Sequence, residues 1–412
     1  MIPIPYALDA VNFLSADVRN LFGPFVNVFL VTSRNWSQTD VGLVTTASGL
    51  IGIAFQTPIG AAIDIVRAKR GVIALTMAAM ALSGVIIFAA PTFWPIAVAL
   101  SILAVAGDAF VPAVSALTLG LVTKDELARR LGRNSAFDHG GNITTALFAG
   151  AVGYALSQRA VFLMVPVLAA LTSAAVLAIP SDAINQNRAR DLSSDGEAPR
   201  TAAGYRIVLE TRPLMIFALC AMLFHFANAP LLPLVGQKLA LQFPKEATAM
   251  MAFCMIAAQG VMLPIAILVG RNADWWGRRP IFLIAFAVLP VRAALYIVSD
   301  NAFWLIGVQL LDGVGAGIYG ALTPLLIADI MRGSGRFNLA QGAVATTMGI
   351  GASLSALFVG EMVDHFGYSA SFLALGAAAA AAFLVFLAFM PETRDEHAPQ
   401  GGAAALEGAA GE

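Results

Sequence analysis

A few ionisable side chains interrupt long apolar stretches of this sequence, where charge is costly. They are Asp17, Arg19, Asp108, His225 and Asp312. A buried carboxylate or imidazole can bind and release a proton, because burial favours the neutral carboxyl group and histidine ordinarily titrates near neutrality. An arginine stays charged and is suited to hold a carboxylate or an anion. These residue types therefore indicate proton-carrying and ion-pair chemistry.

Three of these side chains fall deep in the first half of the chain. Asp17 and Arg19 lie some 10–12 residues into the first predicted helix, at 7–32, and Asp108 lies about 14 residues into the fourth, at 94–122. At 1.5 Å per residue, all three are expected near the bilayer centre. Asp17 and Arg19 are about 200° apart around their helix, which makes Asp108 the better partner for Arg19. The alternative to a coupling site is a permanent structural ion pair.

The second half offers His225 in the seventh predicted helix and Asp312 in the tenth, both at mid-depth. A neutral histidine bonded to a backbone carbonyl is the plain alternative for His225. Arg292, in the ninth helix and nearer the outer surface, is expected either to pair with Asp312 or to contact substrate. Polar side chains expected beside these charges are Asn20, Asn27 and Asn228.

Two similar charged segments follow apolar runs, GAAIDIVRAKR at 60–70 and GRNADWWGRRP at 270–280. A shift of 210 residues superimposes them and also places ALFAG at 146–150 on ALFVG at 356–360. One register that aligns several distant segments predicts a duplicated six-helix unit in parallel topology.

The composition requires a membrane as solvent for these segments. The chain is 59% hydrophobic and 12% charged, with mean hydropathy +0.80, against about 25% charged residues in soluble domains. Long unbroken apolar runs predict helices, since a transmembrane barrel would alternate instead. The expected class is an all-α integral membrane protein with twelve helices, roughly 7–32, 38–63, 71–90, 94–122, 134–156, 160–180, 213–236, 247–269, 280–299, 302–330, 338–362 and 367–390.

The charges also predict domains and orientation. We expect a six-helix bundle at 1–180, a cytoplasmic linker at 181–212, a second bundle at 213–391 and a disordered tail at 392–412. Most of the 24 Lys and Arg fall in segments that face one side if both termini are cytoplasmic. No basic face suited to nucleic acid is left. Cys220 and Cys254 fall inside predicted helices and are not expected to form a disulfide.

The helix count, the polar linker, the repeat and both charged segments resemble the major facilitator superfamily, whose signature after the second helix has a glycine, three residues, an aspartate and then basic residues. The resemblance implies two six-helix bundles that rock about a central cavity lined by the first, fourth, seventh and tenth helices. It also implies a cytoplasmic latch for the closed gate, formed here by Gly60, Asp64, Arg67 and Arg70 and by Gly270, Asp274, Arg278 and Arg279.

The latch spacing has a physical basis. Gly60 and Asp64 lie one turn apart on one helix face, so the glycine admits a neighbouring helix while the carboxylate meets its N-terminus or a basic partner. For the basic residues, enforcement of topology is an equal alternative. Asp138 and His139 are expected near the cytoplasmic start of the fifth helix, as an inner gate or as a solvated turn.

The expected function is alternating-access secondary transport of a small organic solute, with an organic anion as one candidate, coupled to protons. Proton-driven export of a drug or metabolite is the alternative, although the fifth helix lacks a Gly-Pro pair and the fourth lacks a basic residue. A receptor or scaffold without transport is a further alternative. The expected partners are the small-molecule substrate, protons and the lipid bilayer.

The remaining expectations concern chemistry and location. No nucleotide-binding loop, zinc spacing or nucleophile motif is found, so neither an enzyme nor a metal or other cofactor is expected. We expect a monomer in a bacterial inner membrane that binds no nucleic acid.

Overall fold

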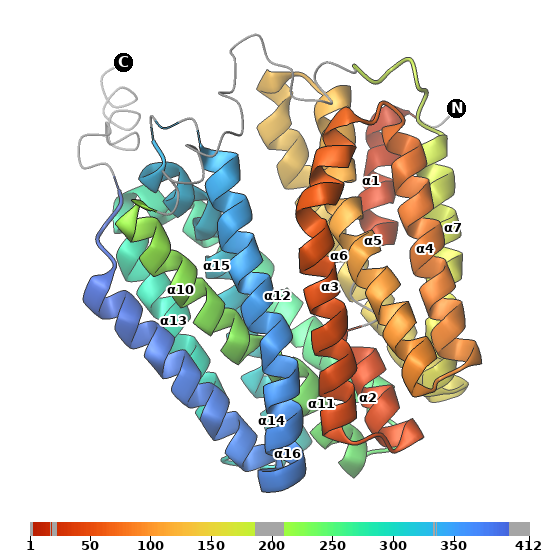
Figure 1. The fold of residues 1–412 in the computed structure, drawn as a ribbon, viewed down its shortest axis with the longest axis vertical. Helices are drawn as coiled ribbons and strands as arrows, with labels where there is room; N and C mark the ends of the chain where they lie inside the picture. The colour runs from red at the N-terminus through yellow and green to blue at the C-terminus, as the bar shows by residue number, and fades with distance from the viewer. Residues whose placement is uncertain are drawn as a thin grey trace, which may run out of the picture.

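The computed structural model describes residues 3–16, 18, 23–185, 210–332, 334 and 336–394, and over these residues the chain forms helices without strands (Figure 1). The helices of the first half are α1 (Ile4–Ser15), α2 (Gly23–Arg34), α3 (Gln38–Ile65), α4 (Lys69–Ala89), α5 (Phe93–Leu121), α6 (Lys124–Ala155), the 3₁₀ helix η1 (Gln158–Leu163) and α7 (Met164–Leu177). Those of the second half are α10 (Arg212–Asn228), α11 (Leu231–Gln242), α12 (Ala247–Trp276), α13 (Arg278–Leu295), α14 (Ala302–Val308), α15 (Leu310–Ile330) and α16 (Phe337–Phe389). The predicted all-helical class is confirmed.

Eight helical segments among the described residues are long and apolar enough to cross a bilayer, judged by length and composition. Large apolar side chains on their outer surfaces, such as Leu75 and Phe148, are exposed, as expected of a surface that faces lipid. Twelve spans remain a prediction, because several predicted spans are divided. The predicted helix 7–32 corresponds to α1 and α2.

The helices that correspond to the seventh and tenth predictions are interrupted. Ala229 and Pro230 separate α10 from α11, and proline has no backbone N–H to continue the ladder. Gln309 alone separates α14 from α15, and the N–H groups of Gln309 and Asp312 bond to carbonyls three residues back. Such tightened turns often mark a functional hinge.

One predicted helix start is wrong, and one predicted loop is a kink at the predicted place. Helix α6 begins at Lys124 rather than at 134, because charged residues excluded from a membrane span can still continue a helix. The predicted helices 338–362 and 367–390 meet without an intervening loop, since Gly367 turns the chain inside α16 with φ 79° and ψ 174°. Only glycine adopts such angles without strain.

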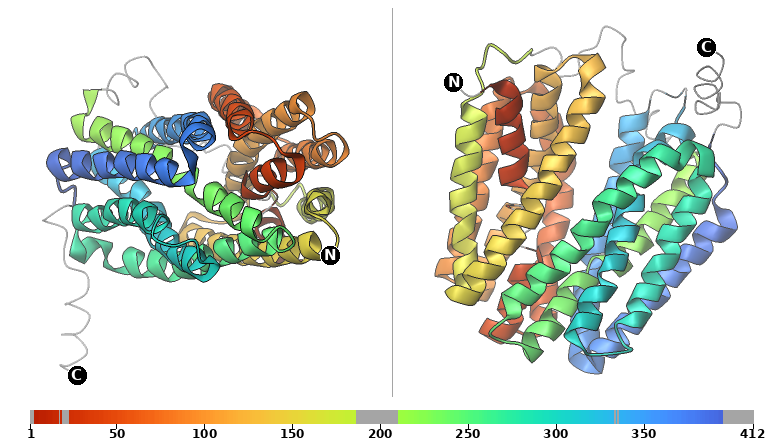
Figure 2. Two further views of the ribbon diagram at one scale, coloured as in Figure 1. Left: turned by 90° about the horizontal axis from the view of Figure 1, so that it is seen from below. Right: turned by 180° about the vertical axis from the view of Figure 1, so that it is seen from behind.

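The two halves lie side by side, α1 to α7 in one and α10 to α16 in the other (Figures 1 and 2). We call the end that carries the turns at 66–68 and Gly277 the near end, and the end that carries the loops 35–37, 243–246 and 299–301 the far end. The start of α1 and the end of the described chain after α16 lie at the near end. The described part of the chain therefore starts and stops on one side.

Small residues allow close approaches between the halves toward the far end. A methyl group placed on Gly42 of α3 would overlap the carbonyl oxygen of Ala356 in α16, and one on Gly153 of α6 would overlap the side chain of Thr248 in α12. Ala252 of α12 packs into the buried core of the first half. Small residues thus let two helix pairs close the far end.

The internal repeat is visible in how the near end is tied. Arg70 donates to the carbonyl oxygens of Leu177, at 3.3 Å, and Ile179, at the end of α7. Arg279 donates to the carbonyl oxygen of Leu387, at the end of α16, at 2.7 Å. Leu387 follows Leu177 by 210 residues, so the same contact recurs in both halves.

Candidate functional site

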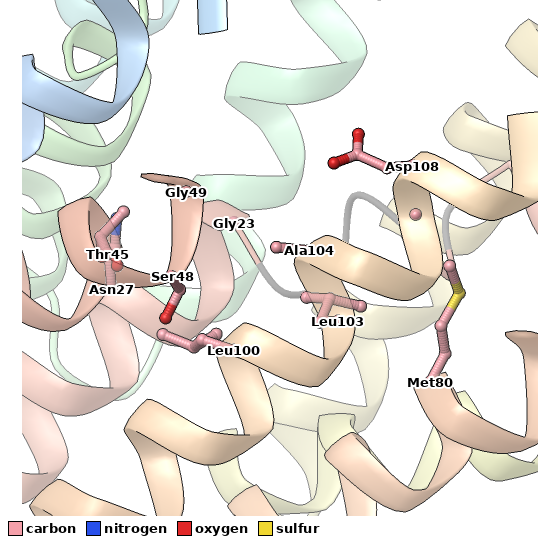
Figure 3. Close-up of a pocket in the computed structure, with 11 residues that line it drawn as sticks. Gly23, Asn27, Thr45, Ser48, Gly49, Met80, Leu100, Leu103, Ala104 and Asp108 are labelled. Atoms are coloured by element: carbon pink, nitrogen blue, oxygen red, sulfur yellow. The ribbon is translucent and has the colours of Figure 1, made fainter. Parts of the chain in front are cut away.

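A cavity of about 350 Å³ opens among α2, α3, α4 and α5 (Figure 3). Asn27, Thr45 and Ser48 lie on one side of it, and Asp108 lies across from them beyond Leu103. Its walls are otherwise apolar. A few polar groups on an apolar wall are typical of a small-molecule site.

Two further cavities share Gly23 with the first. One of about 240 Å³ lies among α2, α3, α11 and α16 and is lined by Asn27 and Gln237. The other, of about 270 Å³, lies among α2, α11, α12 and α15 and is lined by Gln259 and Asp312. The start of α2 therefore adjoins cavities that reach both halves of the chain.

Asp108 is half-buried on α5 and faces the first cavity. Among the described residues, the structure shows neither a hydrogen bond nor an ion pair to its carboxylate. Asp17, Arg19 and Asn20 lie outside the described residues. The expected Arg19–Asp108 pair therefore stays a prediction, and Asn27 lines the cavity.

Asp312 is paired with Arg292, which is one of the two contacts that the sequence analysis considered for this arginine. Arg292 Nη1 lies 2.5 Å from Asp312 Oδ1. The arginine is 1% exposed, so its guanidinium is buried between helices. Asn228, expected beside the substrate, accepts a hydrogen bond from the same guanidinium at 2.7 Å.

His225 makes the contact with a backbone carbonyl that the sequence analysis gave as the alternative to a proton-carrying role. Its Nδ1 lies 3.0 Å from the carbonyl oxygen of Ala221, and its ring lies 5.0 Å from that of Tyr319. The structure shows no contact between His225 and Asp312. A direct interaction of these two candidates is therefore not formed in this conformation.

His139 reaches across the two halves. Its Nδ1 lies 2.8 Å from Oε1 of Gln259 in α12. Because α6 begins at Lys124, the histidine lies near the middle of that helix, which corrects the expected place at its start. Asp138 lines a separate polar cavity of about 340 Å³ among α1, α5 and α6.

The charged turn of the second half is held within that half. Arg278 donates to Asp274 Oδ1 at 2.7 Å and to Asp329 Oδ2, in α15, at 3.0 Å. Burial alone would lower the pKa of the Arg278 guanidinium, but these two carboxylates raise it overall. Sequence reasoning missed Asp329, although an acid at the cytoplasmic end of the tenth predicted helix, opposite a basic turn, is a usable signal.

The latch contacts expected of the first charged segment, at 60–70, are not seen among the described residues. Within the described part of the chain, nothing lies within 4 Å of a methyl group placed on Gly60 or on Gly270, so no described helix approaches either glycine in this conformation. The side chain of Asp64 lies outside the described residues, and Arg67 is exposed. The latch roles stay predictions for a conformation closed at the near end.

Glu392 ties the end of the described chain to the second charged turn. Its carboxylate accepts hydrogen bonds from the backbone N–H groups of Arg278 at 2.9 Å and Arg279 at 3.1 Å, at the start of α13. Burial alone would raise the pKa of Glu392, but these and neighbouring N–H groups lower it overall. The first residues of the predicted disordered tail are thus ordered, while those from 395 lie outside the described residues.

Asp364 caps a helix of the opposite half at the far end. It lies in α16, and its carboxylate oxygens accept from the backbone N–H groups of Gln38, at 3.1 Å, and Thr39, at 2.7 Å, at the start of α3. The Gln38 side chain also donates to the hydroxyl of Tyr368 at 3.0 Å. Sequence reasoning missed Asp364, because an acid near a loop is usually solvated.

A second missed cluster joins α1 to α6. Asp9 is buried and accepts from Arg130 at 2.7 Å and from Arg133 at 2.6 Å. Arg130 also donates to Asn134 at 2.7 Å. The cluster lies within the first half and clamps the first helix at the near end.

Comparison with known proteins agrees with this geometry. The sequence profile described as Major Facilitator Superfamily matches residues 8–290 and 262–410. An uncharacterized MFS-type transporter of Mycobacterium tuberculosis is 45% identical over 393 residues, 94% of this chain and 93% of the relative. A multi-drug resistance efflux pump PmrA homolog of Lactococcus lactis is 30% identical over 165 residues, 40% of each chain.

Solved structures share the fold at low sequence identity. The nucleoside transporter NupG gives a TM-score of 0.77 at 12% identity, covering 94% of this chain and 99% of NupG. A D-xylose-proton symporter gives a TM-score of 0.72 at 13% identity, covering 95% of this chain and 98% of the symporter. At this identity the likeness concerns the fold.

Proposed function

The chain belongs to the major facilitator superfamily of membrane transporters, and from that premise we propose that it moves a small organic solute by alternating access, coupled to protons. The observation that carries the proposal is the placement of Asp108 and Asp312, from opposite halves, on cavities that share Gly23. Carboxylates at such positions can bind and release protons as access alternates.

The coupling step follows from the competition for charge. Asp108 has no partner among the described residues, so a proton, Arg19 or a group of the substrate can neutralise it. A substrate that engages Arg19 would remove the counter-ion of Asp108 and favour its protonated form. This step favours an anionic solute, whereas a cationic solute would contact Asp108 directly.

Reconstituted transport tests the assignment. Radiolabelled solutes, grouped by charge class, are screened for uptake into vesicles that contain the purified protein. Asp108→Asn should keep exchange of substrate between compartments but lose accumulation driven by a pH gradient, with the exposed Asp40→Asn as the matched control. If Asp108→Asn and Asp312→Asn both concentrate substrate as the parent does, facilitated diffusion or sodium coupling becomes the better assignment.

Export of a drug or metabolite is a second candidate. The partial similarity to the PmrA homolog, which is described as a multi-drug resistance efflux pump, supports it. Energy-dependent loss of ethidium from cells that express the protein would favour export. Uptake of no solute in either direction would favour the receptor or scaffold instead.

Further elements of the proposal concern organisation. We take the near end as the cytoplasmic side of a bacterial inner membrane, so that both termini are cytoplasmic. We also propose twelve spans and a monomeric state. The two bundles are assigned to 1–180 and 213–391, joined by the linker at 181–212. On this orientation the conformation is closed toward the outside, where α3 packs against α16 and α6 against α12.

A further inference from the structure

The guanidinium of Arg292 bonds through all three of its nitrogen atoms. Nε donates to the hydroxyl of Tyr296 at 2.9 Å, and Nη2 donates to Oε1 of Gln309 at 3.0 Å. Nη1 donates to Asn228 at 2.7 Å and to Asp312 at 2.5 Å. One buried cation therefore holds four side chains.

The partners of Arg292 lie where two helices are interrupted. Asn228 is the last residue of α10, before the turn that leads to α11. Gln309 is the residue between α14 and α15, and Asp312 lies in the first turn of α15. Arg292 itself belongs to the unbroken part of α13. The same side chain is thus bonded at both breaks.

The segment beyond the first break, α11, packs against α2 of the other half at the far end. A methyl group on Gly236 of α11 would lie 3.2 Å from a methyl carbon of Val28 in α2, across the two halves. Lys238 of α11 forms an ion pair with Asp300, in the loop before α14. A change of angle at the break after Asn228 would therefore move a segment that contacts the first half, and the ion pair connects that segment to the loop before α14.

Asp312 connects this network to the cavity. Its side chain is 17% exposed and lines the cavity of about 270 Å³ together with Gln259. The amide nitrogen of Gln309 is buried and has no partner among the described residues. A buried donor without a partner is costly, so a rearrangement that gives this amide an acceptor would be favourable.

We propose that Arg292 is a positioning residue that ties the charge of Asp312 to the geometry of both helix breaks. A neutral Asp312 would leave the buried guanidinium without its counter-ion, which is strongly unfavourable. Movement of the guanidinium relieves this and alters the contacts of Asn228 and Gln309. Proton binding at the cavity is thereby transmitted to α11 and α14.

The surroundings of Asp312 make Arg292 the dominant charge. Ionisable groups that interact with the pair are Tyr296 on α13 and Cys254 on α12. His225, on α10, is bonded to a carbonyl, and His139, on α6, is bonded to Gln259. Of the described ionisable groups around Asp312, Arg292 alone carries a permanent positive charge. Part of the inference rests on the proposed function, because it takes Asp312 as a group that binds a proton.

The test measures the far end directly, without substrate. Spin labels are attached at Thr92→Cys and Val298→Cys, two exposed far-end positions in opposite halves, and the distance between them is followed from pH 8 to pH 5. Cys220 and Cys254 are buried and can remain in place. The parent should show a change of distance with one midpoint pH.

Variants at position 292 separate positioning from a structural role. Arg292→Gln should move the midpoint upward by roughly 1 pH unit or more, because the carboxylate loses its counter-ion. Arg292→Lys keeps the charge but cannot hold both breaks, so the distances should broaden at pH 8 while the midpoint stays nearer that of the parent. Arg34→Gln, an exposed arginine at the far end, should change neither quantity.

Asp312→Asn should hold the low-pH distance at every pH. An unchanged midpoint and distance distribution in Arg292→Gln would overturn the proposal. If the parent shows no change with pH, proton coupling at Asp312 fails as a separate matter. The positioning role is then supported if Arg292→Gln and Asp312→Asn alter the distance at pH 8 alike, and is rejected if they do not.

Discussion

The carboxylate of Asp364, in the second half, accepts a hydrogen bond of 2.7 Å from the backbone N–H of Thr39, at the start of a helix in the first half. An acid at a helix N-terminus satisfies free N–H groups and complements the helix dipole. Because this contact joins the two halves at the far end, it stabilises the conformation closed there and is lost when the halves separate.

Asp364→Asn should therefore shift the protein toward conformations open at the far end. The loss of a charged cap is worth about 1 kcal/mol. A membrane-impermeant maleimide should label a cysteine at position 39 faster in this variant. Glu361→Gln, an exposed acid one turn earlier on the same helix, is the control, and equal labelling rates in both variants would argue against a gating role.

Gly360→Ala should weaken the same contact between α16 and the start of α3, through steric overlap rather than loss of charge. Its added methyl group would overlap the carbonyl oxygen of Gln38, so the far end should close less completely. Alanine at Gly60 meets nothing within 4 Å in this conformation and should leave far-end closure unchanged. Far-end cysteine cross-linking yields compare the two variants. Loss of near-end closure in Gly60→Ala would support the expected latch.

The two acids that bond to Arg278 should differ in their effect on stability. The side chain of Asp329 is only 9% exposed, so Asp329→Asn leaves the buried Arg278 without this carboxylate and should cost about 3 kcal/mol of unfolding free energy. Asp274 is 89% exposed, and Asp274→Asn should cost at most about 1 kcal/mol. Thermal unfolding in detergent measures both. A transport defect in Asp274→Asn at full stability would indicate a role in another conformation.

Glu392 should make the end of α16 sensitive to acid. Its folded pKa lies below the ordinary value of 4.5, so the contact contributes stability above about pH 4.5 and loses it as the pH falls through the lowered pKa. The difference in thermal midpoint between the parent and Glu392→Gln should be largest at pH 7 and shrink by pH 3.5. A difference that is constant over this range would exclude the carboxylate as its source.

Topology can be tested through the linker. Positive charges predict that residue 195 lies on the same side as both termini, in the cytoplasm. A reporter that is active only in the cytoplasm should be active when it is fused there. The same reporter fused in the loop 243–246 should be inactive and serves as the opposite control. If a reporter that is active only outside the cytoplasm is active at residue 195, the proposed orientation and the helix count of the first half are contradicted.

The sequence alone determined the helical class, the family and the places where helices begin and end to within a few residues for most of the chain. Hydrophobic length and backbone hydrogen bonding leave a chain of this composition few other solutions. The repeat at 210 residues was also readable, and it recurs in the contacts of Leu177 and Leu387. These features depend on local pattern and on the bilayer.

Only the tertiary structure decided which charges meet. Arg292 pairs with Asp312 and reaches Asn228 across 64 positions of sequence, and Asp364 meets Thr39 across 325. Helix rotation and the angles at the breaks set these contacts, and neither is encoded in hydrophobic periodicity. The breaks themselves carry weak local signals, a proline at 230 but no helix breaker at Gln309. Which acid is buried with a partner and which faces a cavity therefore depends on how whole helices pack, because the energy of a charge is set by its neighbours in space.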